Sequence, residues 1–150
     1  MTAATDHRPF AGKVALVAGA SRGIGAVTAR AFADAGAAVV LAARDERALD
    51  EVAGGIRDGG GQALAVRTDV TEAASVERLV ATGLDTYGRL DAAFNNATHN
   101  VPPTPLADID PADFDRSVDS NVRGTFLGLK YEIQAMLRTG GGTIVNMASL

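Results

Sequence analysis

The sequence predicts an α/β protein with a doubly wound parallel sheet. Short apolar runs of strand length alternate with longer segments of helical spacing, and glycines separate them. Continuous apolar strands are typical of parallel sheets buried on both faces, and right-handed helical crossovers return the chain to the same edge. A length of 150 residues fits one domain with a sizeable core, so we take residues 1–150 as a single unit.

The elements follow one another in strict order. The predicted strands cover residues 14–18, 38–42, 62–66, 90–94 and 143–147. The predicted helices cover residues 23–35, 45–58 and 71–87, and a long helix runs from 110 to the glycines at 140–142. Asp45 can cap the second helix, and Pro111 suits the first turn of the long one. Three prolines between 102 and 105 indicate an irregular loop before it.

Three of these helices are predicted from apolar residues at helical spacing. In the helix at residues 71–87 these positions are Val76, Leu79, Val80 and Leu84. In the first helix these positions are Ile24, Val27, Ala31 and Ala35. In the long helix they are Phe114, Val118, Val122, Phe126, Ile133 and Leu137, which we call the apolar stripe.

Composition excludes several classes of protein. The net charge of −4 gives no electrostatic reason to expect nucleic acid or an anionic membrane as partner. There is no cysteine, and His7 and His99 cannot form a metal site alone, so no metal is expected. No apolar run reaches the ~18 to 20 residues that span a bilayer, and residues 1–9 lack a signal-peptide core. We expect a cytoplasmic protein with small-molecule partners.

The turn between the first strand and the first helix carries the main functional motif. It has a GxxxGxG spacing, and its candidate cofactor-binding residues are Gly19, Ser21, Arg22, Gly23, Ile24 and Gly25. Glycine permits positive φ and close approach of the backbone to a diphosphate, and the helix offers unpaired N–H groups. An ordinary glycine-bearing turn is the alternative, which the strand–turn–helix context disfavours. The motif predicts a dinucleotide site.

The end of the second strand bears on which dinucleotide binds. An NAD site usually has an acidic residue there, for the adenosine ribose, but this position falls at Ala43 or Arg44. Arg44 and Arg22 could instead hold a 2′-phosphate by charge-assisted hydrogen bonds, which favours NADP(H) over NAD(H). In the competing interpretation, Asp45 or Glu46 binds the ribose of NAD(H) and Arg44 is a solvated surface charge.

Taken together, the motifs resemble those of the short-chain dehydrogenase/reductase family, in its N-terminal portion. The glycine turn is followed by Asp69-Val70, Asn95-Asn96-Ala97, Asn121-Val122 and the segment 144–149, in family order and over nearly the whole chain from Lys13. The resemblance implies a Rossmann-like fold and hydride transfer between a nicotinamide cofactor and a carbonyl or alcohol.

The same resemblance implies roles for single residues. Asp69 would hold the adenine ring, with Val70 beside it, and Asn95 would stabilise the central sheet. Asn96 and Ala97 would lie at the cofactor, Ala97 near the nicotinamide ribose. Asn121 would anchor a proton-relay water, and the Ser149 hydroxyl would bond the substrate oxygen. Simpler roles remain open: Asp69 as a turn residue, Asn95-Asn96 as turn chemistry, Ser149 as a cap, and Asn121 as a local hydrogen-bonding group.

Two positions depart from the family pattern. Ala18 stands where the family has threonine, which removes a hydroxyl that could brace the turn. Thr98 stands where the family has glycine after Asn-Asn-Ala, and its β-branch resists positive φ.

The family's Tyr-x-x-x-Lys pair is absent from this sequence. The tyrosines are Tyr87 and Tyr131, and neither has a lysine four residues later. We therefore expect a sheet truncated after the fifth strand, with an exposed apolar face at Ile144, Val145 and Met147. The chain would be the front portion of a longer reductase and would not turn over substrate alone.

Two hypotheses of function follow. The first is an oxidoreductase represented by its cofactor-binding half. The alternative is a non-catalytic dinucleotide-binding or interaction module. A downstream Tyr-x-x-x-Lys in the coding sequence would favour the enzyme. A homo-oligomer through the long helix is also possible, since Gly124 and Gly128 would allow close helix packing, although these glycines could equally pack against their own sheet.

Overall fold

A five-stranded parallel sheet forms the centre of the computed structural model, which describes residues 8–148. The strand order is β3-β2-β1-β4-β5. The strands are β1 Val14–Ala18, β2 Ala38–Ala43, β3 Gln62–Arg67, β4 Ala92–Asn95 and β5 Thr143–Asn146. All residues of β1 are buried, as the continuous apolar pattern predicts for a central strand. The doubly wound fold class expected from the sequence is confirmed.

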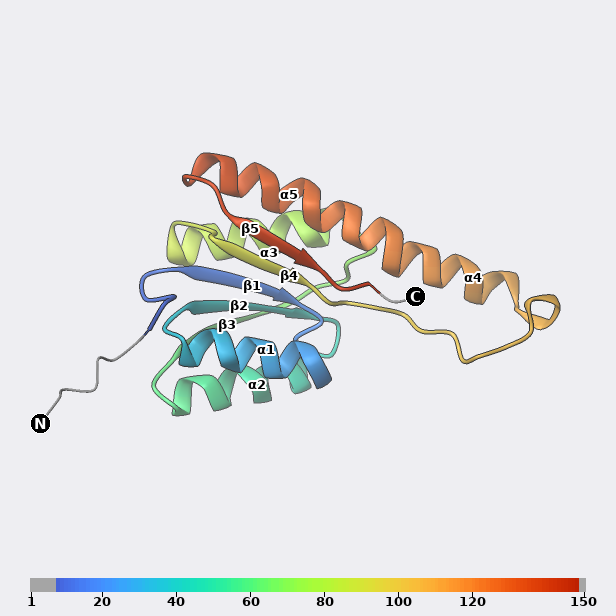
Figure 1. Ribbon diagram of the computed structural model, residues 1–150, viewed down its shortest axis with the longest axis horizontal. Coiled ribbons are helices and arrows are strands. Elements are labelled where there is room, and N and C mark those ends of the chain that lie inside the picture. The colour runs from blue at the N-terminus through green and yellow to red at the C-terminus, as the bar shows by residue number, and fades with distance from the viewer. Residues whose placement is uncertain (1–7, 149–150) are drawn as a thin grey trace, which may run out of the picture.

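Helices cover both faces of the sheet (Figure 1). They are α1 Gly23–Asp34, α2 Glu46–Asp58, α3 Ala73–Tyr87, α4 Pro111–Val118 and α5 Gly124–Arg138. Helices α1 and α2 lie on one face, whose core includes Val17, Val39 and Leu49. Helices α3 and α5 lie on the other, over Leu16, Val40 and Leu79. Strands β1 to β4 therefore contribute alternate side chains to two separate cores.

The N-cap of α2 agrees with the sequence, whereas the start of α3 does not. The side chain of Asp45 accepts a hydrogen bond from the Ala48 N–H at 3.1 Å, and Asp110 caps α4 through the Ala112 N–H at 2.8 Å. Helix α3 begins at Ala73 rather than at Thr71. The reason is local: both the N–H and the hydroxyl of Thr71 are bonded to Asp69, which keeps Thr71 in a turn.

The long predicted helix is continuous but contains a π-helical turn, Asp119–Arg123, between α4 and α5. It begins at Pro111 and ends at Arg138, before the glycines. A short 3₁₀ turn, Leu106–Asp108, precedes it. Together with the loop after β4, α4 extends beyond the carboxyl ends of the strands (Figure 1).

The apolar positions that predicted α1 and the long helix lie on their exposed sides. In α1 the buried residues are Gly25, Ala26 and Ala29, whereas Ile24 and Val27 are exposed. In the apolar stripe the exposed fraction rises to 77% at Leu137. Small residues and glycines allow these helices to pack closely on the sheet, and the bulky side chains point away from it.

Gly124 and Gly128 pack against the chain's own sheet side, which is one of the two alternatives that the sequence left open. A Cβ at Gly124 would lie 2.9 Å from the Val70 side chain, and one at Gly128 would lie 2.9 Å from the Asn95 Oδ1. The absence of a side chain at both positions lets α5 approach β4 and the turn after β3.

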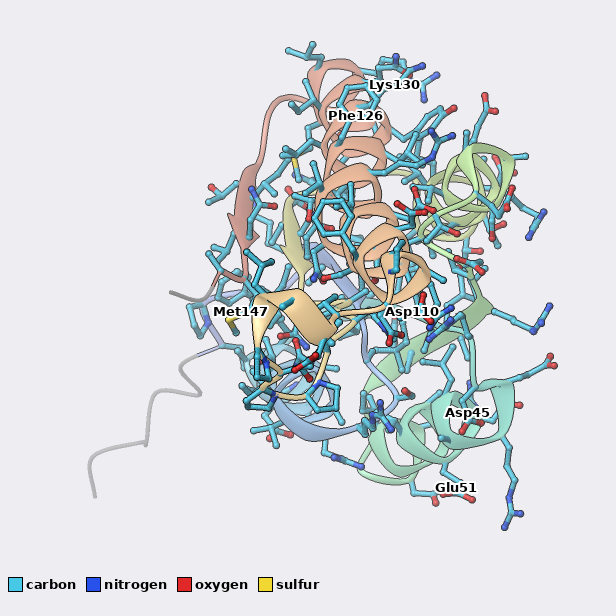
Figure 2. All side chains as sticks on the ribbon, turned by 90° about the vertical axis from the view of Figure 1, so that its right-hand side faces the viewer. Asp45, Glu51, Asp110, Phe126, Lys130 and Met147 are labelled. Carbon is cyan, nitrogen blue, oxygen red and sulfur yellow. The ribbon has the colours of Figure 1, made fainter. Side chains whose placement is uncertain are left out.

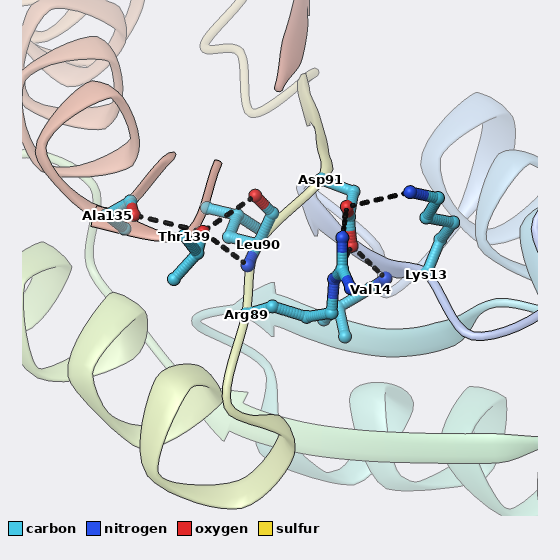
Figure 3. A network of polar contacts seen from close by, with 7 residues as sticks. All are labelled: Lys13, Val14, Arg89, Leu90, Asp91, Ala135 and Thr139. Atoms are coloured by element: carbon cyan, nitrogen blue, oxygen red, sulfur yellow. Dashed lines mark hydrogen bonds and ion pairs between the residues drawn. The ribbon is translucent and has the colours of Figure 1, made fainter. Parts of the chain in front are cut away.

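The amino-terminal edge of the sheet is held by one carboxylate (Figure 3). Asp91 accepts hydrogen bonds from the Val14 N–H at 2.9 Å and from two nitrogens of Arg89, and Lys13 lies 3.5 Å away. Burial raises the pKa of Asp91, but the bonds and positive charges outweigh it, and the net pKa lies below the ordinary value. This contact joins β1 to the start of β4.

Two of the three residues expected on an exposed apolar face at β5, Val145 and Met147, are exposed. Val145 is 55% exposed and Met147 37%, because neither α1 nor α2 reaches this edge strand. Ile144 points to the opposite face and packs against the core beneath α5.

Candidate cofactor site

The candidate site lies at the carboxyl ends of β1 and β4. Strand β1 pairs with β2 on one side and with β4 on the other, so the strands that follow β1 are placed first on one side of it and, from β4 onward, on the other. Open α/β sheets bind ligands in the crevice at such a switch point. Figure 2 looks onto these carboxyl ends, with Asp45 at the start of α2 and Met147 after β5 well apart in the view.

The backbone of the glycine turn, residues 19–25, packs closely at this switch point. Gly19 has a φ of +78° and Gly23 of +54°, a region that favours glycine. A Cβ at Gly25 would stand only 2.0 Å from the Gly19 carbonyl oxygen. A Cβ at Gly19 would stand 2.8 Å from the Ala97 nitrogen. The turn therefore needs glycine at all three positions that define the motif.

The first turn of α1 lies at these strand ends without a capping side chain. Arg22 is the N-cap residue, with an extended backbone, and among the described residues no side chain bonds the free N–H groups. The first turn also contains no acidic residue. Ser21 precedes Arg22, and Ile24 is exposed beside it. An uncapped helix start combines free donors with the positive end of the helix dipole, as an anion requires.

Two arginines and Asp69 stand at the ends of β2 and β3. Arg44 follows β2, and Arg67 ends β3, in register with Ala43. Burial raises the pKa of the Asp69 carboxyl. The hydrogen bonds from Thr71 and the positive charges of both arginines lower it by more, so the net pKa of Asp69 lies below its ordinary value. The sequence analysis did not single out Arg67, although a basic residue at the end of a predicted strand was a usable signal.

Asp69 is held as a turn residue. Its Oδ1 accepts from the Thr71 N–H at 3.0 Å and from the Thr71 hydroxyl at 2.8 Å. Its own N–H donates to the Ser75 hydroxyl at 3.0 Å. The simpler interpretation of this residue is thus realised in the geometry, and Val70, next to it, packs against Gly124.

The segment after β4 lies against the glycine turn. The Asn96 N–H donates to the Ala18 carbonyl at 3.1 Å, and the Ala97 backbone is in van der Waals range of Gly19. The chain then passes Thr98 without positive φ, since only glycines among residues 8–148 have it. A family glycine is thus not required here by backbone conformation.

Asn121 lies in the π turn and holds the loop that follows Ala97. Its Nδ2 donates to the His99 carbonyl at 2.9 Å, and its Oδ1 accepts from the His99 N–H at 3.0 Å. Nδ2 also lies 3.1 Å from the Ser117 hydroxyl. Single π turns inside α-helices are frequent at functional sites. Ser149, the other catalytic candidate, lies outside the described residues.

A buried carboxyl stands behind the site. Glu132 on α5 is 1% exposed and accepts a hydrogen bond from the Asn95 Nδ2 at 2.9 Å. Burial raises the pKa of Glu132 to about 7, and the bond from Asn95 opposes the rise only in part. Sequence analysis missed Glu132; a lone acid within an apolar helical segment was the available signal.

A cavity of about 810 Å³ opens at the other edge of the sheet and is separate from this site. Lys13, Arg30, Tyr87 and Arg89 are among its lining residues. It lies at the amino ends of the strands, whereas ligands of parallel sheets bind at the carboxyl ends.

Tyr131 is on α5 beside Lys130. The Nζ of Lys130 lies 5.3 Å from the centre of the Tyr131 ring.

Comparison with known proteins agrees with this geometry. A family model described as short chain dehydrogenase matches residues 13–150. The A-factor type gamma-butyrolactone 1'-reductase (1S-forming) of Streptomyces virginiae is 45% identical over 138 residues, which are 91% of this chain and 54% of that protein. Cis-4-hydroxycyclohexanecarboxylate dehydrogenase of Sinomonas cyclohexanicum is 43% identical, over 94% of this chain and 56% of its own length.

A solved structure is similar throughout the fold. The crystal structure of a metagenomic short-chain oxidoreductase in complex with NADP superposes with a TM-score of 0.88 at 36% identity, covering 94% of this chain and 64% of the other. The architecture and the glycine-rich first crossover define a Rossmann-like α/β protein. The chain belongs to the short-chain dehydrogenase family, whose named relatives are oxidoreductases.

The chain spans about half the length of the curated relatives that it matches. Within residues 8–148, no helix has both the length and the apolar character needed to cross a membrane.

Proposed function

We propose that this chain is the dinucleotide-binding domain of an oxidoreductase that transfers a hydride between NADP(H) and a carbonyl or alcohol substrate. The observation that carries the proposal is the glycine turn, packed tightly at the switch point and followed by an uncapped helix. The reductase and dehydrogenase names of the relatives support the class of reaction.

The glycine turn suits a diphosphate. A side chain at Gly19 or Gly25 would clash with backbone, so the main chain itself forms the surface that a phosphate would approach. The N–H groups of Gly23, Ile24 and Gly25 begin α1 and would donate to the phosphate oxygens. Ser21 lies on the same turn, where its hydroxyl would add a donor.

The preference for NADP(H) follows from the side chains at the adenosine end. Arg22 and Arg44 are exposed cations at this edge, and either would make charge-assisted bonds to a 2′-phosphate. Asp45, the competing ribose ligand, already uses its Oδ1 to cap α2. Asp69 and Val70 would lie along the adenine, and Asn96 and Ala97 at the nicotinamide half.

Bound NADP(H) would supply or accept the hydride. In this chain, Ser149 would donate a hydrogen bond to the substrate oxygen, by family resemblance. Asn121 would contribute by holding the His99 backbone, and through it the loop next to the nicotinamide half. A tyrosine with a lysine four residues later is not among these 150 residues, so we propose turnover only for a protein that also carries such a pair.

Titration with both reduced cofactors tests the proposal. We expect NADPH to bind more tightly than NADH, measured by cofactor fluorescence. Arg44→Asp should weaken NADPH binding by about ten-fold or more, since a charge-assisted bond contributes about 1.5 to 3 kcal/mol, and should change NADH binding little.

Arg47→Asp is the matched control. Arg47 is 92% exposed on α2 and pairs with Glu51. Equal losses for NADPH and NADH in Arg44→Asp would remove the assignment of NADP(H), and no binding of either cofactor would remove the proposed function.

We also propose that two copies pair through the apolar stripe of α4 and α5. Phe114, Val122 and Phe126 are each at least 60% exposed, and large apolar side chains gathered along one helix are typical of an interface. Figure 2 shows Phe126 on α5, at the opposite end of the molecule from Asp45 and Glu51 on α2.

A further inference from the structure

Glu132 has no role in the function proposed above, yet burying its carboxyl group costs free energy of folding. Its side chain is almost completely buried against the core between α5 and the sheet. Moving a carboxyl group out of water costs free energy, which shows here as the rise of its pKa to about 7. A methionine or leucine would fill similar space without this cost, but leucine has no hydrogen-bond acceptor and the methionine sulfur is only a weak one.

Asn95, the hydrogen-bond partner of Glu132, connects three elements of the fold. Both hydrogens of the Asn95 Nδ2 are used, one for the Glu132 Oε2 at 2.9 Å and one for the Asn146 Oδ1 at 3.0 Å. Gly128, one turn before Glu132, leaves the room that the other end of the Asn95 amide occupies. The amide therefore connects α5, the end of β4 and the end of β5.

The ends of these two strands lead directly to the site. Asn95 is followed by Asn96 and Ala97, which contact the glycine turn. The Asn95 carbonyl accepts from the Met147 N–H at 2.9 Å, two residues before Ser149. A displacement of the Asn95 side chain would thus shift the cofactor segment and the catalytic segment together.

We propose that Glu132 is a positioning residue of the cofactor site: the bond that it accepts from Asn95 fixes the carboxyl ends of β4 and β5 relative to the glycine turn. The inference rests on the proposed function for its consequence in cofactor binding. The contact itself can be tested in the ligand-free protein.

Three variants separate positioning from core packing. Glu132→Gln keeps an oxygen that can accept from Asn95 and has nearly the same shape. Glu132→Met removes the oxygen acceptor and keeps the volume. Met136→Ala is the matched control, since Met136 is equally buried one turn further along α5, and no hydrogen bond joins it to Asn95 within the described chain.

The first readout is NMR on ¹⁵N-labelled, ligand-free protein. In Glu132→Met we expect the two Asn95 side-chain amide hydrogens to shift and the Met147 and Asn96 backbone amides to exchange about ten-fold faster, as local opening becomes easier. Glu132→Gln should keep both signals near those of the wild type. Met136→Ala should leave the Asn95 side-chain signal in place.

The second readout is NADPH affinity at a temperature where all variants are folded. Glu132→Met should raise the Kd about ten-fold, because small displacements at a preorganised site are costly, and Glu132→Gln should restore it to within about three-fold. Gly128→Ala provides an independent test if Glu132→Met does not fold: its Cβ would push on the Asn95 Oδ1, and it should reproduce both effects.

The outcomes are decisive in each direction. Unchanged Asn95 signals and unchanged NADPH affinity in folded Glu132→Met, or in Gly128→Ala, would overturn the proposal. The proposal would also be overturned if Glu132→Gln, which keeps a hydrogen-bond acceptor, did not keep the Asn95 signals and the NADPH affinity near those of the wild type. If the wild type itself does not bind NADPH, the proposed function fails, while the NMR readout still decides whether Glu132 positions Asn95.

Discussion

The side chain of Asn121 and the backbone of His99 bond each other in both directions: the amide donates to the carbonyl at 2.9 Å and accepts from the N–H at 3.0 Å. A side-chain amide can satisfy a peptide group in this way without any other partner. The π turn in the long helix is therefore linked to the loop after β4, 22 residues earlier in the chain.

Substitution of Asn121 should loosen this loop. Asn121→Ala removes two bonds to His99, so we expect the free energy of unfolding to fall by about 1 to 3 kcal/mol and the His99 amide to exchange faster. Asn121→Asp should lower the free energy of unfolding at least as much as Asn121→Ala, because a carboxylate oxygen would then face the His99 carbonyl oxygen. Ser117→Ala removes only the bond to Ser117, and a loss as large as that of Asn121→Ala would contradict this account.

Stability should fall as the pH rises from about 4.5 to about 7. Glu132 has an ordinary pKa of 4.5 and a folded pKa of about 7, so the folded state binds its proton more tightly than the unfolded state does. The contribution is complete below the unfolded pKa and is lost as the pH passes the folded pKa; the raised pKa corresponds to about 3 kcal/mol.

Chemical denaturation at a series of pH values measures this slope. Glu132→Gln should flatten the curve between about pH 5 and 7. Asp69 and Asp91 do not interfere, since their pKa values lie below the ordinary 3.8. A curve that keeps its slope in Glu132→Gln would show that another group titrates.

Two glycine-to-alanine substitutions should act in opposite directions. Gly25→Ala places a Cβ 2.0 Å from the Gly19 carbonyl oxygen, so the glycine turn must move, at a cost of about 1 to 3 kcal/mol and of NADPH binding. Gly54→Ala, within α2, meets nothing within 4 Å and should stabilise the protein by about 0.5 to 1 kcal/mol. Thermal unfolding of both variants, with and without NADPH, is the measurement.

Charge on the apolar stripe should prevent pairing of copies. Phe126→Glu places a carboxylate in the middle of the stripe, and we expect sedimentation to show a smaller species than the wild type at the same concentration. Leu106→Glu is the control, since Leu106 is 87% exposed but lies outside the helix. Equal behaviour of Phe126→Glu and wild type would place any interface elsewhere.

The sheet could be predicted closely from the sequence because its strands have strong and simple patterns. Strand β1 begins and ends as expected, and β2 and β3 each extend one residue further. Strand β4 was placed two residues early, since Leu90 is apolar and buried but precedes the strand. Local propensity marks a strand well, whereas its ends depend on pairing.

The buried faces of the helices could not be predicted in the same way. Apolar spacing at Ile24 and Val27 indicated α1, but the residues that touch the sheet are glycine and alanine. Hydrophobicity alone does not distinguish a face that packs on the sheet from one that awaits another partner. The role of Glu132 depends on Asn95, 37 residues away, and no local pattern contains such a pair.

The motifs at the ends of the first, third and fourth strands were found because each sits beside an element boundary. Gly19, Gly23 and Gly25 needed only a strand before them and a helix after them. Arg67 was missed because it directly follows the predicted strand 62–66, where a charged residue is commonly attributed to solvent exposure. The roles of these residues toward a cofactor remain predictions, which the titrations above test.

The π turn also sets the rotational phase of the long helix. Phe114 and Phe126 are 12 residues apart, and at about 100° per residue an unbroken α-helix would separate them by about 120° around its axis. An i→i+5 turn takes up about one extra residue and leaves them only about 20° apart. A single irregular turn thus aligns apolar side chains of α4 and α5 along one line, while directing Asn121 toward the loop that it binds.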